Sequence, residues 1–291
     1  MLLDYATYHR QSIDAGDVDP SYSMLRYMSD RFELNVEQRY WLAWLYATCY
    51  CGPTVFYVYN EFPDYENVDE GRLERWWAAN RHRLLFQTDR RWVRSRNQWT
   101  AMFRSYRSAI GRGTQEQRFA LLKSKDRHLN YDNCWQAFGG MYQFGRFAMF
   151  LYLEAVHVVT GFPMMPRTMN LADADSCRNG LSLAIGRADL NTHGTEARLS
   201  KKEHATLQAE FDALVARMER HDARNNVWNI ETTLCAYKKY CYGKRYVGYY
   251  LDRQRDEIAA MERNVPEGVD WSVLWQYRKE TFAHRWLKEV A

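Results

Sequence analysis

Three side chains at helical spacing are the first candidates for chemistry in this sequence. In the segment NIETTLCAYKKYCYGKRYVGYYLDR, Glu231, Cys235 and Lys238 stand at i, i+4 and i+7, which places them on one face of a helix. Arg245 and Asp252 follow in the turn and the next helix. Such a face supplies a carboxylate base beside cations. A surface charge pair between Glu231 and Lys238, with Cys235 packed between them, explains the spacing equally well.

A second polar set stands in the segment LADADSCRNGL, which precedes a short helix expected near residues 174–184. Asp173 and Asp175 are two residues apart and are followed by Arg178 and Asn179. A carboxylate base or metal ligand beside a cationic clamp for phosphate would use these residue types. Helix capping by one aspartate and a surface pair with Arg178 is the alternative.

Metal and nucleotide chemistry have few other signals in this sequence. The six cysteines, at positions 49, 51, 134, 177, 235 and 241, form no CxxC pair and no zinc-type spacing with the eight histidines. Carboxylates that hold Mg²⁺ leave almost no sequence signature, so Mg²⁺ stays compatible with the sequence. No GxGxxG, GxxxxGK[ST], HExxH or GxSxG motif occurs.

Positive charge is concentrated between residues 81 and 127, where thirteen basic residues face three acidic ones. Local basic fields of this kind attract polyanions, and aromatic rings beside them can stack on bases. The alternative is a solvated helix face neutralised by the acidic remainder of the chain. The residues that would combine phosphate contact with stacking are Arg90, Arg91, Arg94, Arg96, Arg104, Arg107, Trp92, Trp99 and Tyr106.

The helical pattern of the apolar residues predicts an all-α protein of 291 residues. Asn35 is expected to cap a helix over residues 34–51, and Asn67 or Asp69 is expected to cap the next helix. Ser200 is expected to cap a helix over residues 201–221 through a capping box. Further helices are expected over 90–111, over 54–62, where a strand is the alternative, and from 270 onward. The segment 132–160 is expected to be a central helix in which Gly139, Gly140 and Gly145 indicate either a break or a close approach of backbones. The segment 226–263 is expected to form two helices separated by a glycine-containing turn. We expect residues 1–291 to form a single compact unit, or two closely packed helical lobes.

Aromatic residues make up 15% of the chain, and most are expected to pack between helices while some form platforms for bases. The first residues lack a basic leader with an apolar core, and the longest apolar stretch, residues 147–159, is too short to cross a membrane. A reduced cytoplasmic protein is the expectation.

Four segments together resemble a known family. They are NVEQRYWLAWLYATCYCGPTVFYVYNEF, LLFQTDRRWVRS, NLADADSCRNGL, and WNIETTLCAYKK with GKRYVGYYLDRQ. The sequence resembles the amino acid:DNA transferases, or α-glutamyl/putrescinyl thymine pyrophosphorylases, of bacteriophages that hypermodify thymine. The resemblance covers most of the chain and implies a helical fold related to DNA glycosylases.

The resemblance also implies a reaction and a setting. In DNA, 5-hydroxymethyluracil already pyrophosphorylated by a separate kinase would lose pyrophosphate to the amine of a free amino acid, in the cytoplasm of the infected host. We favour flipping of the base into a pocket that excludes water. A DNA-binding protein without catalytic activity and a DNA glycosylase are the alternatives.

Site roles follow as hypotheses from this implied reaction. Glu231 or Asp175 would act as general base, and Arg178, Lys238 and Arg245 would bind pyrophosphate. A second route adds a thiolate of Cys49, Cys177 or Cys235 to C6 of the ring. The residues predicted to bind substrate are Tyr59, Asn60, Gln136, Asn179 and Asp252. The residues predicted to bind DNA are Arg90, Arg91, Trp92, Arg94, Arg96 and Lys239.

Overall fold

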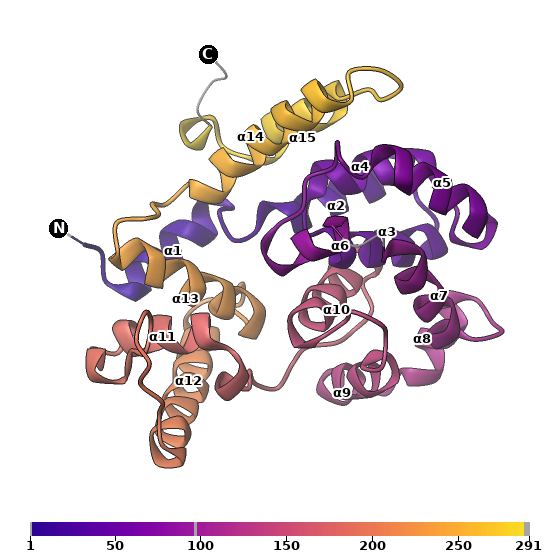
Figure 1. Ribbon diagram of the computed structural model, residues 1–291. Coiled ribbons are helices and arrows are strands. Elements are labelled where there is room, and N and C mark those ends of the chain that lie inside the picture. The colour runs from indigo at the N-terminus through magenta and orange to yellow at the C-terminus, as the bar shows by residue number, and fades with distance from the viewer. Residues whose placement is uncertain (1, 96–97, 288–291) are drawn as a thin grey trace. The chain divides into compact units, whose positions relative to one another are not determined.

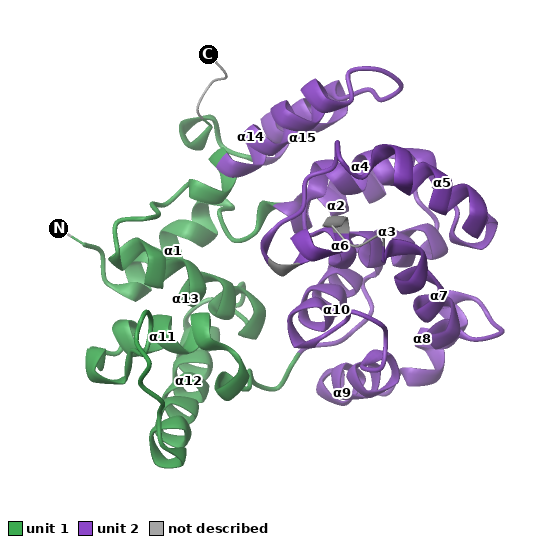
Figure 2. Ribbon diagram, in the orientation of Figure 1, with its two compact units in different colours: residues 1–20, 166–252, 282–291 green, residues 21–165, 253–281 purple. Residues whose placement is uncertain are grey.

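The protein is helical throughout the residues that its computed structural model describes, which are 2–95 and 98–287 (Figure 1). No strand occurs among these residues, so the all-α prediction is confirmed. The chain divides into two compact units, shown in different colours in Figure 2. Unit 1 comprises residues 1–20, 166–252 and 282–291, and unit 2 comprises residues 21–165 and 253–281.

Unit 2 contains most of the helices. The α-helices of this unit are α2 (Pro20–Arg31), α3 (Val36–Cys49), α4 (Gly52–Glu61), α5 (Glu70–Asn80), α6 (Arg91–Ser95), α7 (Trp99–Ile110), α8 (Gln115–Leu122), α9 (Arg127–Phe138), α10 (Arg146–Thr160), most of α14 (Tyr249–Asn264), and α15 (Ser272–Thr281). The short 3-10 turns η1 (Tyr65–Asn67) and η2 (Thr88–Arg90) connect them. The helices α3 and α10 pack against each other at its centre.

The predicted start of α3 is confirmed. Asn35 and Gln38 form a reciprocal capping box, in which each side chain accepts from the other residue's backbone N–H. The helix ends at Tyr50, whose φ of 49° lies in the left-handed region that non-glycine residues rarely adopt. Helix α4 then begins at Gly52 with Pro53 in its first turn, where the missing N–H costs no hydrogen bond.

Aromatic rings fill the core of unit 2. Trp41 and Trp44 stack with their ring centres 4.9 Å apart, and Tyr106 stacks on Trp44 at 5.1 Å. Trp99 and Tyr106 are fully buried. Their predicted role as surface platforms for bases is therefore wrong, because neither ring is accessible to a nucleic acid.

Two segments in which the sequence predicts a long helix are interrupted. The segment 90–111 forms η2, α6 and α7 in succession, and 132–160 falls in α9 and α10 with a turn between them. Gly145 adopts an extended conformation, with φ −69° and ψ −178°, as the N-cap of α10. The glycine-rich sequence of this turn predicted a break as one of two outcomes, and the break is what occurs.

Unit 1 is built around one central helix. Its α-helices are α1 (Tyr5–Ala15), α11 (Asp175–Ala184), α12 (Lys201–His221) and α13 (Val227–Cys241), with the 3-10 turns η3 (Leu171–Asp173), η4 (Ala188–Leu190) and η5 (His284–Trp286). Helices α1 and α11 both pack on α13 (Figure 1). The predicted capping box of α12 is present, with Ser200 bonded to Glu203.

A buried hydrogen-bond chain attaches α1 to α13. His9 Nε2 lies 2.8 Å from Asn225 Oδ1, and because Asn225 donates its amide to Met218 O, Nε2 is the donor in this pair. Nδ1 lies 2.7 Å from the hydroxyl of Thr233, which also bonds to Tyr5. Burial lowers the pKa of His9 and so favours the neutral ring, which is held by Asn225 on one side and Thr233 on the other.

A buried aspartate caps the start of α14. The carboxylate of Asp17 accepts from the backbone N–H groups of Gly248, Tyr250 and Leu251 at 2.6, 2.7 and 3.0 Å. Burial raises the pKa of Asp17 to about 6, although these hydrogen bonds oppose the shift. All four residues belong to unit 1, so this cap fixes the turn that follows α13.

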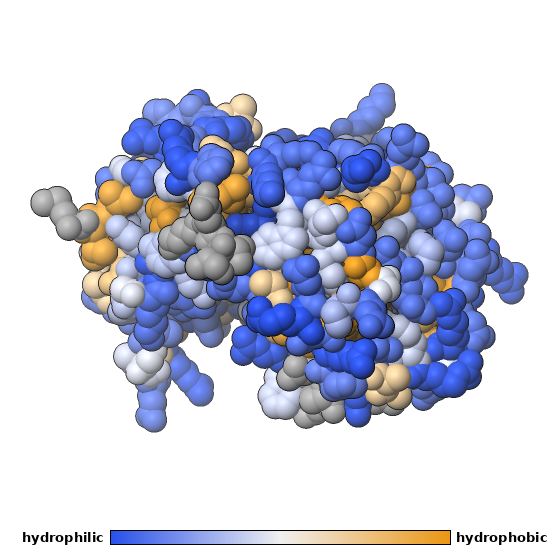
Figure 3. Space-filling view, turned by 90° about the horizontal axis from the view of Figure 1, so that it is seen from above, coloured by the Kyte–Doolittle hydropathy of each residue, from blue (hydrophilic) through white to orange (hydrophobic). Residues whose placement is uncertain are grey.

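The surface is mostly hydrophilic on the face shown in Figure 3, with small scattered apolar patches. Among the described residues, no helix has both the length and the apolar composition that a membrane span requires.

We predict that His9 makes folding sensitive to mild acid. In the unfolded chain His9 takes up a proton near pH 6.5, whereas in the folded protein its pKa is lower. The contribution of His9 to the free energy of unfolding therefore falls as the pH drops below 6.5, by at most about 1.4 kcal/mol per pH unit. Asp17 acts in the opposite direction, because its raised pKa adds stability below about pH 6. Urea unfolding of wild type and His9→Gln between pH 5 and 7 isolates the histidine.

The difference in unfolding free energy between these two proteins should shrink as pH falls. His82→Gln, which alters an exposed histidine, should leave the wild-type profile unchanged. Parallel profiles for wild type and His9→Gln would contradict the assignment of a neutral buried imidazole.

Candidate functional site

The backbones of α11 and α13 touch at a glycine. A Cβ atom on Gly180 would lie 2.0 Å from the carbonyl oxygen of Leu234, far inside van der Waals contact. Only glycine allows this approach. The contact brings the amino-terminal half of α11 against the middle of α13, where the candidate residues of both sequence segments lie.

The predicted polar face of α13 is present, and it is buried. Glu231 and Lys238 are only 8% and 6% exposed, so the surface charge pair considered as an alternative does not form. The thiol of Cys235 donates to Glu231 Oε1 at 3.4 Å and lies beside Ser176 of α11. The i, i+4, i+7 spacing therefore directs three functional groups toward α11.

Helix α11 contributes a fixed guanidinium group. Arg178 is 7% exposed and donates to the carbonyl oxygens of Leu171 and Ala172 at 3.1 and 3.0 Å, and it pairs with Asp175. This pair was the expected alternative for the aspartate, whose side chain is 79% exposed. Asn179 is buried and accepts from the backbone N–H of Thr192 at 2.7 Å.

Positive charge accumulates around Lys238. Burial lowers the pKa of its ammonium group, Cys235 and Asp175 oppose this shift, and the neighbouring Arg245 and Lys244 add to it. Lys238 makes no hydrogen bond or ion pair with any residue that the structure describes. A buried cation with this environment is a strong candidate for binding an anion.

His193, in the loop after η4, lies in the same positive electrostatic field. The pKa of this exposed histidine is lowered chiefly by the charge of Lys238 and also by burial, Lys244 and Lys239. Its ring lies 5.4 Å from that of Tyr242, which accepts a hydrogen bond from Asn191 at 2.8 Å. The loop and the end of α13 thus form one basic, aromatic surface.

Arg245 and Asp252 are held by tyrosines of the turn between α13 and α14. The guanidinium of Arg245 lies over the rings of Tyr249 and Tyr250, 4.8 and 4.5 Å from their centres, and donates to the Tyr250 hydroxyl. Asp252 is buried and accepts from the Tyr246 hydroxyl. The turn therefore presents a positioned cation close to the end of α13.

The thiols are poorly suited to nucleophilic attack. Burial raises the pKa of Cys49 to about 12, and burial followed by the charge of Glu231 raises the pKa of Cys235. Thiolates, not thiols, are the reactive species, so the structure disfavours the route through either residue. Within the described residues, no three His, Cys, Asp or Glu side chains are grouped closely enough to hold a metal ion.

Comparison with known proteins gives this site a family. A sequence profile of the amino acid:DNA transferase family matches residues 13–246, which is most of the chain. The chain belongs to this family. The suspected resemblance is thus confirmed, and the matched region contains the whole polar cluster formed by α11, α13 and Arg245.

A relative of this chain has a more specific name. The chain is 30% identical over 263 residues to a serinyltransferase of Salmonella phage ViI. The match covers 84% of this chain and 63% of the relative, so the chain spans less than two thirds of the relative's length. No solved structure matches the chain significantly, and a relation to DNA glycosylases stays a prediction.

The other predicted residues of this transferase lie in unit 2, apart from Lys239 of α13. Tyr59 is buried, whereas Asn60 and Gln136 are exposed. The amide of Asn60 donates to Phe56 O at 2.8 Å, as a local helix contact. These three residues belong to unit 2 and the α11–α13 cluster to unit 1, and their roles stay predictions.

The predicted DNA contacts of unit 2 differ in accessibility. Trp92 is 62% exposed and Arg91 is exposed, as a surface contact requires. Arg90 is only 6% exposed and donates to Gln143 O at 2.8 Å, so it supports a loop in this conformation. Arg96 and the side chain of Arg94 lie outside the described residues.

Sequence reasoning missed a buried carboxylate cluster in unit 2. Glu257 is 7% exposed and accepts from Gln87 Nε2 at 2.6 Å, from Arg253 Nε at 2.7 Å and from the thiol of Cys51. Its only sequence signal was the i, i+4 spacing of Arg253 and Glu257. Gln87 and Cys51 are distant in sequence, so no local pattern connects them.

Strained backbone surrounds this missed cluster. Gln87 N–H donates to Cys49 O at 3.4 Å, and the residues that follow these two, Thr88 and Tyr50, have φ angles of 48° and 49°. Gln143, whose carbonyl accepts from Arg90, has a φ of 62°. Such strain is concentrated at functional sites in proteins, which makes these loops a second region of interest.

We predict that Gly180→Ala destabilises the protein by about 1–3 kcal/mol, because the added Cβ forces α11 and α13 apart. Urea unfolding measures the change. Gly140→Ala is the matched control, since its Cβ would meet nothing within 4 Å and its φ is not positive. Equal stabilities of the two variants would refute a backbone contact at Gly180.

Proposed function

We propose that this chain transfers an amino acid to a modified thymine base in DNA and that the Lys238 cluster binds the departing pyrophosphate. The observation that carries the proposal is a largely buried lysine, Lys238, whose ammonium group has no hydrogen bond or ion pair within the described residues and lies near Arg245 and Lys244. Preorganised cations lower a reaction barrier when they face the position where negative charge develops. Arg245 is among the charged neighbours of Lys238, and Arg178 is connected to it through Asp175, which pairs with Arg178 and also acts on Lys238.

The proposed reaction replaces one bond with another. The amine nitrogen of the amino acid attacks the 5-methylene carbon of 5-pyrophosphoryloxymethyluracil, and a C–N bond forms. The C–O bond to pyrophosphate breaks, and its electron pair leaves with the pyrophosphate. The proton released by the amine passes to a general base. A kinase acting on 5-hydroxymethyluracil in DNA must supply this substrate.

Burial favours Glu231 over Asp175 as the general base. Glu231 is largely removed from water beside Cys235, whereas Asp175 is exposed and paired with Arg178. Asp175 instead orients the guanidinium of Arg178 toward the pyrophosphate.

Contact with the DNA is assigned to exposed basic and aromatic groups. In unit 1 these are Lys239, Lys244 and the paired rings of His193 and Tyr242, and in unit 2 Arg91 and Trp92 are candidates. Flipping of the modified base would bring its 5-methylene group away from bulk water at a cost of a few kcal/mol.

The relative named serinyltransferase makes serine the first donor to test. The proposal is tested by incubating the protein with DNA that contains pyrophosphorylated 5-hydroxymethyluracil, the twenty amino acids and putrescine, followed by mass spectrometry of the nucleosides. A new nucleoside with an added donor supports the transferase and names the donor. DNA binding with no new nucleoside would indicate a binding protein, and free base or abasic sites would indicate a glycosylase.

We predict that Glu231→Gln lowers kcat by at least about 100-fold, as expected for the loss of a general base. Asp175→Asn should lower it by less than about tenfold, because the amide still accepts a hydrogen bond from Arg178. Single-turnover rates with modified DNA measure both changes. Equal losses in the two variants, or near-normal turnover of Glu231→Gln, would overturn the assignment of Glu231.

We predict that Lys238→Met lowers kcat by about 100- to 1,000-fold, because one charge facing the leaving group is lost. The fold should persist, since methionine fills a similar volume and removes a buried charge. Lys202→Met on the exposed face of α12 is the control and should behave as wild type. Single-turnover rates and far-UV circular dichroism distinguish lost chemistry from unfolding, and a rate within threefold of wild type would refute the role.

A further inference from the structure

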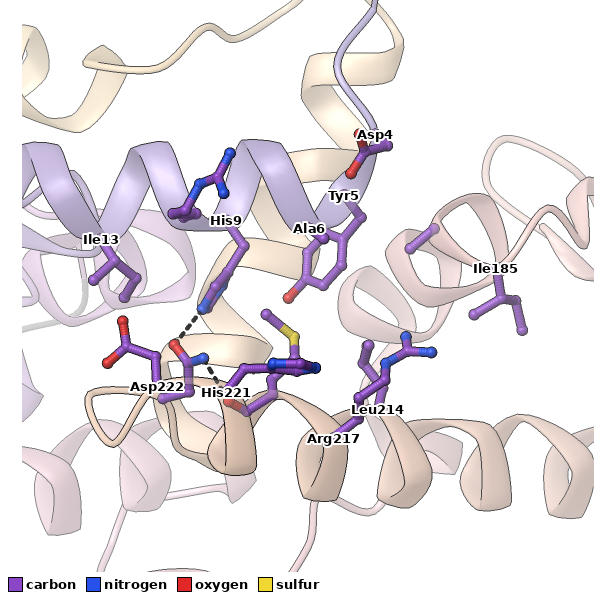
Figure 4. Close-up of a pocket in the computed structure, with 14 residues that line it drawn as sticks. Asp4, Tyr5, Ala6, His9, Ile13, Ile185, Leu214, Arg217, His221 and Asp222 are labelled. Carbon is purple, nitrogen blue, oxygen red and sulfur yellow. Dashed lines mark hydrogen bonds between the residues drawn. The ribbon is translucent and has the colours of Figure 1, made fainter.

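Unit 1 contains a cavity that the proposed chemistry does not use. Its volume is about 560 Å³, and it is lined by α1, the end of α11, the second half of α12 and the turn before α13. Figure 4 shows side chains of α1 and α12 pointing toward each other across this space. The apolar part of the wall comes from Ala6, Ile13, Ala184, Ile185, Leu214 and Met218.

The inner polar groups of this cavity are occupied. His9 and Asn225 bond to each other, and Asn225 also bonds to the backbone of Met218 (Figure 4). The Tyr5 hydroxyl is bonded to Thr233. These groups therefore fix the shape of the wall and leave the recognition of a charged ligand to the residues nearer to solvent.

Two guanidinium groups supply unpaired positive charge. Arg217 on α12 and Arg10 on α1 both line the cavity and are exposed. Neither makes a hydrogen bond, an ion pair or a ring contact within residues 2–95 and 98–287. His221, one helical turn after Arg217, lines the cavity as well.

The two carboxylates of the lining, Asp4 and Asp222, already accept hydrogen bonds within the protein and remain ionised. Asp4 caps α1 by accepting from the Thr7 backbone, which lowers its pKa. The Arg224 side chain holds the pKa of Asp222 at about 2. The cavity thus combines free cations, satisfied carboxylates and an apolar wall.

We propose that this cavity binds the free α-amino acid donor, with its carboxylate at Arg217 and Arg10 and its side chain against the apolar wall. A guanidinium group is the geometry that recognises a carboxylate through two parallel hydrogen bonds. Asp222 offers a negative charge to the ammonium group of the incoming zwitterion. This inference rests on the proposed transferase function, because it identifies where the amino acid donor of that reaction would bind.

The cavity adjoins the helix that carries the proposed base. The Tyr5 hydroxyl donates to Ile230 O at 3.3 Å, and the next residue along α13 is Glu231. Asn225 precedes α13, and the four steps from Val227, where the helix begins, to Glu231 rise by roughly 6 Å along the helix. A donor in the cavity would therefore enter beside the first turns of α13.

Binding is tested by titrating the full chain with serine and with the other amino acids in a calorimeter, without DNA. We expect saturable binding of at least one amino acid, weakened about tenfold or more by Arg217→Ala and by Arg10→Ala. Arg217→Lys should lose part of the affinity, because it keeps the charge without the paired donors. Arg220→Ala, on the same helix but outside the cavity, should bind as wild type.

Transfer kinetics supply the second readout. Arg217→Ala should raise the KM for the donor amino acid about tenfold or more and leave kcat within about threefold. Ala6→Phe, which fills the cavity without removing charge, should have the same effect. An unchanged donor KM in both variants, or binding of inorganic phosphate in place of every amino acid, would overturn the proposal.

These outcomes distinguish a failure of the cavity assignment from a failure of the proposed transferase function. Transfer that persists with an unchanged donor KM in Arg217→Ala refutes the cavity assignment and leaves the transferase intact. Amino acid binding that is lost in Arg217→Ala, with no transfer by the wild type, supports the cavity and refutes the transferase.

Discussion

The backbone contact between α11 and α13 fixes the position of the polar groups of the candidate site. At Gly180 the backbone of α11 lies so close to Leu234 O of α13 that no side chain fits between the two helices. Arg178 and Asn179 precede this contact on α11, and Glu231, Cys235 and Lys238 surround it on α13. A small displacement of either helix would separate the carboxylate from the cations, and binding energy depends steeply on such distances.

Charge in this site is not balanced within unit 1. Buried charges are ordinarily paired, because an unpaired one loses the solvation of water. Lys238 departs from this rule among the described residues, and its lowered pKa is the physical sign of that cost. Under the function proposed for this member of the amino acid:DNA transferase family, the negative charges of DNA and pyrophosphate would balance the unpaired positive charge.

The sequence predicted elements better than it predicted their contacts. The helix cap at Asn35 and the capping box at Ser200 are local effects, and both occur as expected. The break near Gly145 is one of the two outcomes that the glycines of this segment indicated. Helical spacing also identified the face of α13, although it left open whether that face was buried. The Glu257 cluster and the burial of Trp99 depend on residues distant in sequence, which no local pattern connects. The helices before residue 32 had no prediction, although α1 lines the amino acid cavity.

The division of unit 1 among three chain segments constrains the order of folding during synthesis. Helix α1 leaves the ribosome first, but His9 bonds to Thr233, which lies 224 positions further along the chain. The segment 21–165 of unit 2 is translated earlier than α11, α12 and α13. The apolar face of α1 must therefore remain unsatisfied while most of the chain is made, and contacts of such long sequence separation form slowly. The nascent protein is most exposed to aggregation in that interval.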